Sequence, residues 1–144
     1  MPAHPEVWRP LIGLPCLEIV WDPISGALLE LGRRVRLPEP INNDALTLGQ
    51  RNFKGTQNLF IQSCPWQLER GEEAMEGWDS IDLLRGEVIT HVSEFARGDV
   101  TISWSNDLRL LLWASLTTRG TCYSVKVGES WWRVEAGEEL RRST

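Results

Sequence analysis

Short runs of alternating apolar and polar residues, separated by turn residues, restrict most strongly how this chain can fold. In Leu14 to Trp21 and again in Val100 to Trp104, apolar side chains recur at every second position. This is the period of a strand with one buried face. Asp22 to Gly26 and Ser105 to Asp107 carry residues that favour tight turns. The pattern predicts a mainly β fold, or an α+β fold with one short helix.

Further strands are expected wherever the alternation returns: Ala27 to Leu31, Arg33 to Leu37, Leu59 to Ser63, Trp66 to Glu69, Glu87 to Phe95, Leu108 to Ala114, Cys122 to Val127 and Trp131 to Glu135. From Pro38 to Gln57 the alternation is lost, which predicts a long loop with one short strand at Ala45 to Leu48; loops of this length are often functional. We expect a helical turn at Ser80 to Leu84 with Ser80 as its N-cap. The charged tail from Glu138 to Thr144 is expected to fray.

The chain reads as a single domain, residues 1–144, built from two similar halves at about 11–69 and 84–136. Leu11-Ile12-Gly13 matches Leu84-Arg85-Gly86, and Trp66-Gln67-Leu68-Glu69 matches Trp132-Arg133-Val134-Glu135. Chance similarity between two β-meanders is the other explanation. Two antiparallel meander halves of this kind are expected to pack as a sandwich or a partly open barrel.

The charge and the apolar runs exclude some classes of partner. A net charge of −5 argues against nucleic acid, which needs a basic face to neutralise its phosphates. No apolar run approaches the roughly 18 to 20 residues needed to span a bilayer, and the N-terminus lacks the features of a signal peptide. The three cysteines show no paired spacing. We therefore expect a cytoplasmic protein that binds neither membranes nor nucleic acid.

Catalytic and metal-binding patterns are scarce. His91 falls in the middle of an expected strand, and Cys64 as a nucleophile would need His91 as its base. No histidine or cysteine spacing matches a metal site, so we expect neither metal nor cofactor. The sequence favours a protein that is not an enzyme. A catalytic carboxylate pair stays open, because position along a strand does not give separation in space.

An acidic segment that contains a tryptophan is one candidate interaction surface. Glu72, Glu73 and Glu76 precede Trp78, so acidic side chains surround an aromatic ring. Such a surface would attract a basic protein partner electrostatically and anchor it on the ring. The alternative is a solvated linker in which Trp78 covers the core.

A pair of adjacent tryptophans near the C-terminus is the other candidate. Neighbouring side chains on a strand point to opposite faces, so one of Trp131 and Trp132 faces the core and the other lies outside. We expect Trp131, with Trp113 near it, to mark a dimer surface or a ligand groove.

The segment Gln62-Ser63-Cys64-Pro65-Trp66-Gln67 resembles the motif of an uncharacterised family of small bacterial β-rich proteins. That family's motif is Gln-x-Cys-Pro-Trp-Arg, so Gln67 departs from it. Gly98-Asp99-Val100 and Trp132-Arg133-Val134 also resemble the family's second half. The family has no known function, but some such proteins look like immunity proteins of bacterial toxin systems, which implies a binding role.

Two functions from different classes follow. The leading one is a non-enzymatic protein-interaction module of immunity or regulatory type. The alternative is a small-molecule binding protein or weak enzyme with a tryptophan-lined pocket between the two halves. Homodimerisation through an exposed sheet edge is compatible with both.

Overall fold

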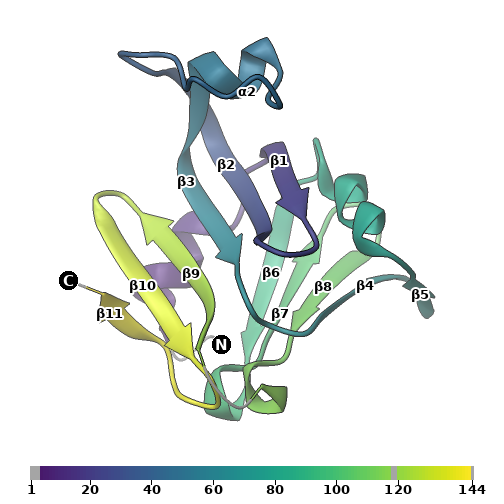
Figure 1. Cartoon of the computed structure of the whole chain (residues 1–144). Coiled ribbons are helices and arrows are strands. Elements are labelled where there is room, and N and C mark those ends of the chain that lie inside the picture. Colours follow the sequence, from purple (N-terminus) through teal and green to yellow (C-terminus); the bar gives the residue numbers. More distant parts are fainter. Residues whose placement is uncertain (1–3, 118–119, 144) are drawn as a thin grey trace.

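The computed structural model describes residues 4–117 and 120–143 and confirms a mainly β fold of two antiparallel sheets that do not close into a barrel (Figure 1). One sheet has the strand order β1-β2-β3-β9-β10-β11 and the other β5-β4-β8-β7-β6. The strands in these described ranges are β1 Cys16–Asp22, β2 Gly26–Arg36, β3 Phe53–Ile61, β4 Trp66–Arg70, β5 Glu73–Met75, β6 Ile89–Glu94, β7 Val100–Trp104, β8 Leu108–Leu112, β9 Thr121–Val127, β10 Ser130–Glu135 and β11 Arg141–Ser143.

Short helices precede β1 and lie between later strands. They are α1 Pro5–Trp8, η1 Arg9–Leu11, α2 Leu48–Asn52, η2 Trp78–Leu84, η3 Ala96–Gly98 and η4 Ala114–Leu116. Within the described ranges, none of them is long and apolar enough to cross a membrane.

The two sheets exchange strands. The meander β1-β2-β3 is followed by the hairpin β4–β5, which joins the other sheet beside β8. The meander β6-β7-β8 is followed by the hairpin β9–β10, which joins the first sheet beside β3. Each sheet therefore contains strands from both halves of the chain.

Backbone hydrogen bonds between the starts of β1 and β6 follow the same symmetry. The N–H of Gly13 donates to the carbonyl of Ile89 at 2.7 Å, and the N–H of Gly86 donates to the carbonyl of Cys16 at 2.7 Å. Gly86 stands 73 residues after Gly13, and Ile89 stands 73 residues after Cys16. Both glycines have positive φ, 92° and 82°, which a side chain would disfavour. This is the offset that relates Leu11-Ile12-Gly13 to Leu84-Arg85-Gly86; duplication as its origin stays a prediction.

The match between Trp66 and Trp132 is wrong. By strand order the counterpart of β4 is β9, because β4 pairs with β8 as β9 pairs with β3. Trp66 lies opposite Leu112 and Tyr123 lies opposite Ile61, so Tyr123 holds the place equivalent to Trp66. Trp132 belongs to the next strand, β10. Any two strands with one buried face share alternation, so a four-residue likeness does not fix which strands correspond.

The core lies between the inner faces of the two sheets. Leu29 and Leu59 contribute from one sheet and Ile102 and Leu110 from the other, all 0% exposed. The N-terminal segment forms α1 and η1 and buries Val7, Trp8 and Leu11 completely. The ring of Trp8 lies 6.2 Å from that of Tyr123. Residues 1–3 lie outside the described residues.

The expected strand at Ala45 to Leu48 is wrong, because a helix cap forms there. The hydroxyl of Thr47 accepts from the N–H of Gln50 at 3.2 Å, and the side-chain oxygen of Gln50 accepts from the N–H of Thr47 at 2.8 Å. This capping box starts α2 at Leu48. The expected loop also ends earlier than Gln57, since β3 begins at Phe53.

Two other local expectations are corrected. Ser80 is not an N-cap: η2 begins at Trp78 after Gly77, and the Ser80 hydroxyl donates to the carbonyl of Gly77 at 2.7 Å. The C-terminal tail forms β11, whose Ser143 lies opposite Trp131. Pairing with β10 orders a segment whose charged sequence alone indicated fraying. Thr144 lies outside the described residues, as do positions 118 and 119.

We expect Tyr123→Phe to destabilise the fold by about 1–3 kcal/mol. The buried hydroxyl of Tyr123 donates to the carbonyl of Gly98 at 2.8 Å, so its removal leaves that carbonyl without this donor. Urea unfolding measures the effect, with the denaturant slope as control for the compactness of the unfolded state. An unchanged midpoint would contradict the prediction.

Candidate functional site

Three tryptophans from distant parts of the chain meet beside β1, β4 and η2. The rings of Trp21 and Trp78 stack with centroids 6.0 Å apart and planes 14° apart, and Trp66 meets Trp78 edge-on at 5.2 Å. All three are half-buried and pack against the core. Stacked and edge-on contacts are the favourable geometries for aromatic pairs. Trp78 is therefore the middle ring of a cluster, which we call the tryptophan cluster.

Polar contacts fix the cluster in one arrangement. The indole N–H of Trp21 donates to Oδ2 of Asp82 at 3.0 Å. Oδ1 of Asp82 lies 3.3 Å from Arg85, which also pairs with Glu18 at 3.0 Å and donates to the carbonyl of Ile19 at 2.6 Å. The ring of Trp21, which stacks on Trp78, is thus held by Asp82 of η2, and Arg85 connects Asp82 to β1.

A hollow of about 360 Å³ opens beside the cluster. It is lined by Cys64, Pro65, Trp66, Gln67, Met75, Gly77 and Trp78. Its walls come from the start of β4, the end of β5 and the start of η2. Trp78 therefore covers the core on one side and lines an open hollow on the other, so both interpretations of this residue apply to it.

The acidic residues identified from the sequence lie around this hollow. Glu72, Glu73 and Glu76 are exposed. None of the three forms an ion pair with any residue in the ranges 4–117 and 120–143. Their charges are thus left for solvent or a partner.

The strand β5 is the last strand of its sheet. It pairs with β4 on one side, where Leu68 lies opposite Met75 and Arg70 opposite Glu73. Its other side faces no strand of the described chain. An edge of this kind presents free backbone donors and acceptors to another extended segment. We call Trp66, Met75 and Trp78, together with Glu72, Glu73 and Glu76, the acidic edge.

Trp113 and Trp131 are not brought together. Trp131 lies on β10 and lines a hollow with Ser130 and Arg142, whereas Trp113 follows β8 in the other sheet and lines a separate hollow with Phe95. The expectation that Trp113 lies near Trp131 is wrong, because the chain crosses to the other sheet between β8 and the hairpin β9–β10. Trp131 is 38% exposed and Trp132 packs against the core, so the opposed orientation of this pair is confirmed.

Two cysteines that are distant in the sequence form a buried pair. The N–H of Gln62 donates to the carbonyl of Cys122 at 2.8 Å, which brings Cys64 beside Cys122. The pKa of the Cys64 thiol is raised well above its ordinary value, mainly by the hydrogen bond with Cys122 and secondly by burial. Burial raises the pKa of Cys16 to about 12. A thiol with a raised pKa is a poor nucleophile at neutral pH.

The carboxylates matched by the sequence are engaged by arginines. Glu69 pairs with Arg109 at 3.1 Å, and Glu135 pairs with Arg133 at 3.2 Å. Across the described residues, no group of three or more histidine, cysteine, aspartate or glutamate side chains is placed to hold a metal ion.

Sequence reasoning found the acids and Trp78 but missed three members of the site. Trp21 and Met75 carried no signal, since their contact with Trp78 depends on how the sheets pack. Trp66 was visible in the Cys-Pro-Trp segment, where it was assigned to a strand without a role. Comparisons with protein-family models, with curated proteins and with solved structures found no match.

We expect Trp78→Ala to cost about 2–4 kcal/mol of stability, somewhat less than for a fully buried tryptophan. The substitution removes both ring contacts of the cluster. Trp131→Ala is the matched control, because its ring makes no aromatic contact with other described residues; a loss under about 1 kcal/mol is expected there. Guanidinium unfolding compares the two variants. Equal losses would show that the cluster adds nothing beyond surface packing.

Proposed function

We propose that this protein is a non-enzymatic interaction module that binds a basic protein partner through its acidic edge. The observation that carries the proposal is a free sheet edge with three unpaired carboxylates next to an aromatic hollow. Each of these features supplies a different part of a binding reaction.

The carboxylates of the acidic edge attract a basic partner, and the hollow binds one of its side chains. Charge complementarity accelerates encounter and excludes acidic competitors. The hollow between Trp66 and Trp78 accepts one side chain of the partner, and aromatic residues of this kind often carry much of the binding energy. The open side of β5 can add a partner strand through main-chain hydrogen bonds. An arginine- or lysine-bearing extended segment fits all three.

A role of immunity or regulatory type follows from this mode of binding. A small acidic protein that occupies a basic surface blocks whatever that surface binds, and it needs no chemistry of its own. This step rests on analogy with other small acidic binding proteins.

A second copy of the chain fits β5 poorly. Antiparallel pairing of β5 with itself would bring the glutamates of two copies together, and like charges across strands are destabilising. Another edge strand, β11 at the end of the other sheet, carries Arg141 and Arg142. Self-association of unlike edges would join β5 to β11 head to tail, an arrangement that forms chains rather than closed dimers.

A small flat ligand in the hollow is the second candidate. The observation that favours it is the pair of rings, Trp66 and Trp78, in the lining. Pockets that bind small molecules are lined mainly by apolar and aromatic side chains of this kind. This candidate needs the rings but not the surrounding carboxylates, so substitutions separate the two functions.

Affinity capture from the native lysate tests the proposal with three proteins. The wild type is expected to retain a basic protein in a complex of defined size. Changing Glu72, Glu73 and Glu76 to Gln is expected to weaken this complex by at least about tenfold, because three attractive charges are lost. Titration of the identified partner measures the affinity.

The matched control changes Glu6, Glu39 and Glu129 to Gln. These carboxylates are also exposed, so the net charge changes equally at other places. If the control weakens binding as much as the first variant does, the loss of affinity comes from the net charge and not from the position of the three carboxylates. A complex that survives both the triple change and Trp78→Ala would overturn the acidic edge as the binding surface.

A further inference from the structure

The outer face of β1, β2 and β3 carries an apolar row where a solvated face would carry polar side chains. Val20 lies opposite Leu28, and Leu28 lies opposite Phe60. The neighbouring positions Ile19, Leu29 and Leu59 face the core and are buried. These strands are therefore apolar on both faces in their middle, and something must cover the outer row.

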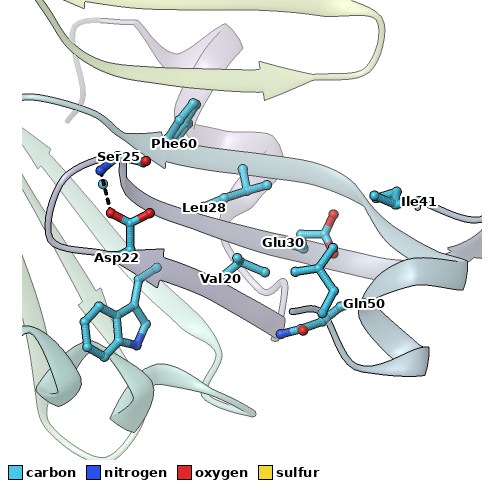
Figure 2. A pocket seen from close by; sticks show the side chains of 11 residues that line it. Val20, Asp22, Ser25, Leu28, Glu30, Ile41, Gln50 and Phe60 are labelled. Carbon is cyan, nitrogen blue, oxygen red and sulfur yellow. Dashed lines mark hydrogen bonds between the residues drawn. The ribbon is translucent and has the colours of Figure 1, made fainter. Parts of the chain in front are cut away.

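The segment between β2 and β3 provides part of that cover. Ile41, Leu46 and Gln50 of this segment line a groove with the apolar row, and the groove has a volume of about 220 Å³ (Figure 2). The segment is held to the ends of its strands: the N–H of Leu37 donates to the carbonyl of Asn52 at 2.7 Å, and that of Ile41 to the carbonyl of Arg51 at 2.9 Å. Ile41 is still 46% exposed, so the cover is incomplete.

Two acceptors lie side by side at the polar end of this face. Glu30 lines the groove, and Asn58 lies opposite it on β3. The Oδ1 atom of Asn58 is buried and has no hydrogen-bond partner among the residues that the structure describes. A buried acceptor without a donor is costly unless a ligand or water supplies one.

The carboxylate of Glu30 is not neutralised by an ion pair within the described chain. The N–H of Gly55 donates to it, and Glu18, Lys54 and Arg34 are the charged groups that act on it. Glu18, opposite Glu30 on β1, is engaged by Arg85, and Arg51 of α2 is engaged by Asp44. Burial is the main cause that raises the pKa of Glu30.

This combination selects a class of ligand. Apolar walls favour a hydrocarbon body, and unneutralised acceptors favour a group that only donates, which an ammonium does. A dry cavity of about 150 Å³ holds benzene. A groove of about 220 Å³ therefore accommodates one ring or a short branched chain with a terminal amine.

We propose that the groove formed by Val20, Leu28, Glu30 and Phe60 under the 37–52 segment binds a small apolar amine, with the ammonium group at Glu30. This site is separate from the acidic edge, since it lies on the outer face of the other sheet.

Titration by ¹⁵N NMR with 2-phenylethylamine and with 2-phenylethanol tests this proposal. The two molecules have nearly the same shape but differ in charge. The amine is expected to shift the amide signals of β1, β2 and β3 and to bind at least about tenfold more tightly than the alcohol, because a charged hydrogen bond adds to the apolar contact. Equal affinities, or shifts confined to other strands, would overturn the proposal.

Glu30→Gln is expected to abolish the preference for the amine. Glutamine keeps a side-chain oxygen that accepts from the N–H of Gly55, so the substitution leaves this hydrogen bond in place. Glu129→Gln, an exposed position, is the control with the same change of charge and should keep the preference. A preference that persists in Glu30→Gln would show that another group binds the ammonium.

The amine could be free or carried by a protein, and a further probe separates these sources. N-acetyl-lysine methylamide presents an ammonium on a chain attached to a backbone. We expect it to bind more weakly than 2-phenylethylamine, because the groove is short and the 37–52 segment covers part of it, which leaves little room for an attached backbone. Tighter binding of the lysine probe would assign the groove to a protein side chain and overturn the small-molecule proposal.

Glu30→Gln is also expected to raise the thermal midpoint of the free protein at pH 7. The pKa of Glu30 is raised in the folded state, so the protonated form is the one that the fold favours. The contribution of Glu30 to the free energy of unfolding is therefore fully present at a pH below its pKa in the unfolded chain. It is lost as the pH rises through its pKa in the folded protein. The advantage of the variant should therefore disappear towards pH 4, and calorimetry at pH 4 and pH 7 measures it. A constant difference at both pH values would show that Glu30 is not placed as an unneutralised acceptor.

Discussion

The exchange of hairpins between the two sheets is the constraint on which the rest of the structure depends. Without β9, the backbone groups on one side of β3 would have no partner, and the same holds for β8 without β4. Each exchange converts an edge strand into an inner strand and brings a second apolar face over the core. Backbone pairing and core burial are thereby satisfied together, because neither half can complete its own sheet.

The same exchange places both sites. The chain leaves β3 at Ile61 and enters β4 at Trp66, with Cys64 and Pro65 between the sheets. The carbonyl of Pro65 accepts from the N–H of Trp113 at 3.0 Å, so proline stands where an acceptor is used and no donor is required. The crossing delivers Trp66 to Trp78 and leaves β5 as the last strand of its sheet. It also keeps the outer row of β1, β2 and β3 on the far side of the first sheet from the core.

Much of the strand architecture could be predicted from the sequence, because alternation with a period of two depends on local burial alone. The exchange of hairpins could not, since it depends on which strand pairs with β3 and β8. The helix at Leu48–Asn52 was missed because its start is set by one capping box. The outer apolar row did leave a signal: Leu28 and Leu29 are adjacent, as are Val20 and Trp21, and neighbouring apolar side chains on a strand face opposite sides. The long segment before β3 gave a second signal, because such segments often have functional roles.

Trp21 connects the groove to the acidic edge, and its contacts determine whether binding at one site affects the other. It contributes to the lining of the groove, and its ring stacks on Trp78 beside the acidic edge. Coupling between two sites requires an element with two arrangements that each occupant favours differently. The indole of Trp21 is tied to Asp82, which Arg85 connects to Glu18, so a second arrangement would break a chain of charged contacts. Because Trp21 is held in one arrangement, it does not transmit a change from one site to the other. The geometry therefore favours independent binding at the groove and at the acidic edge.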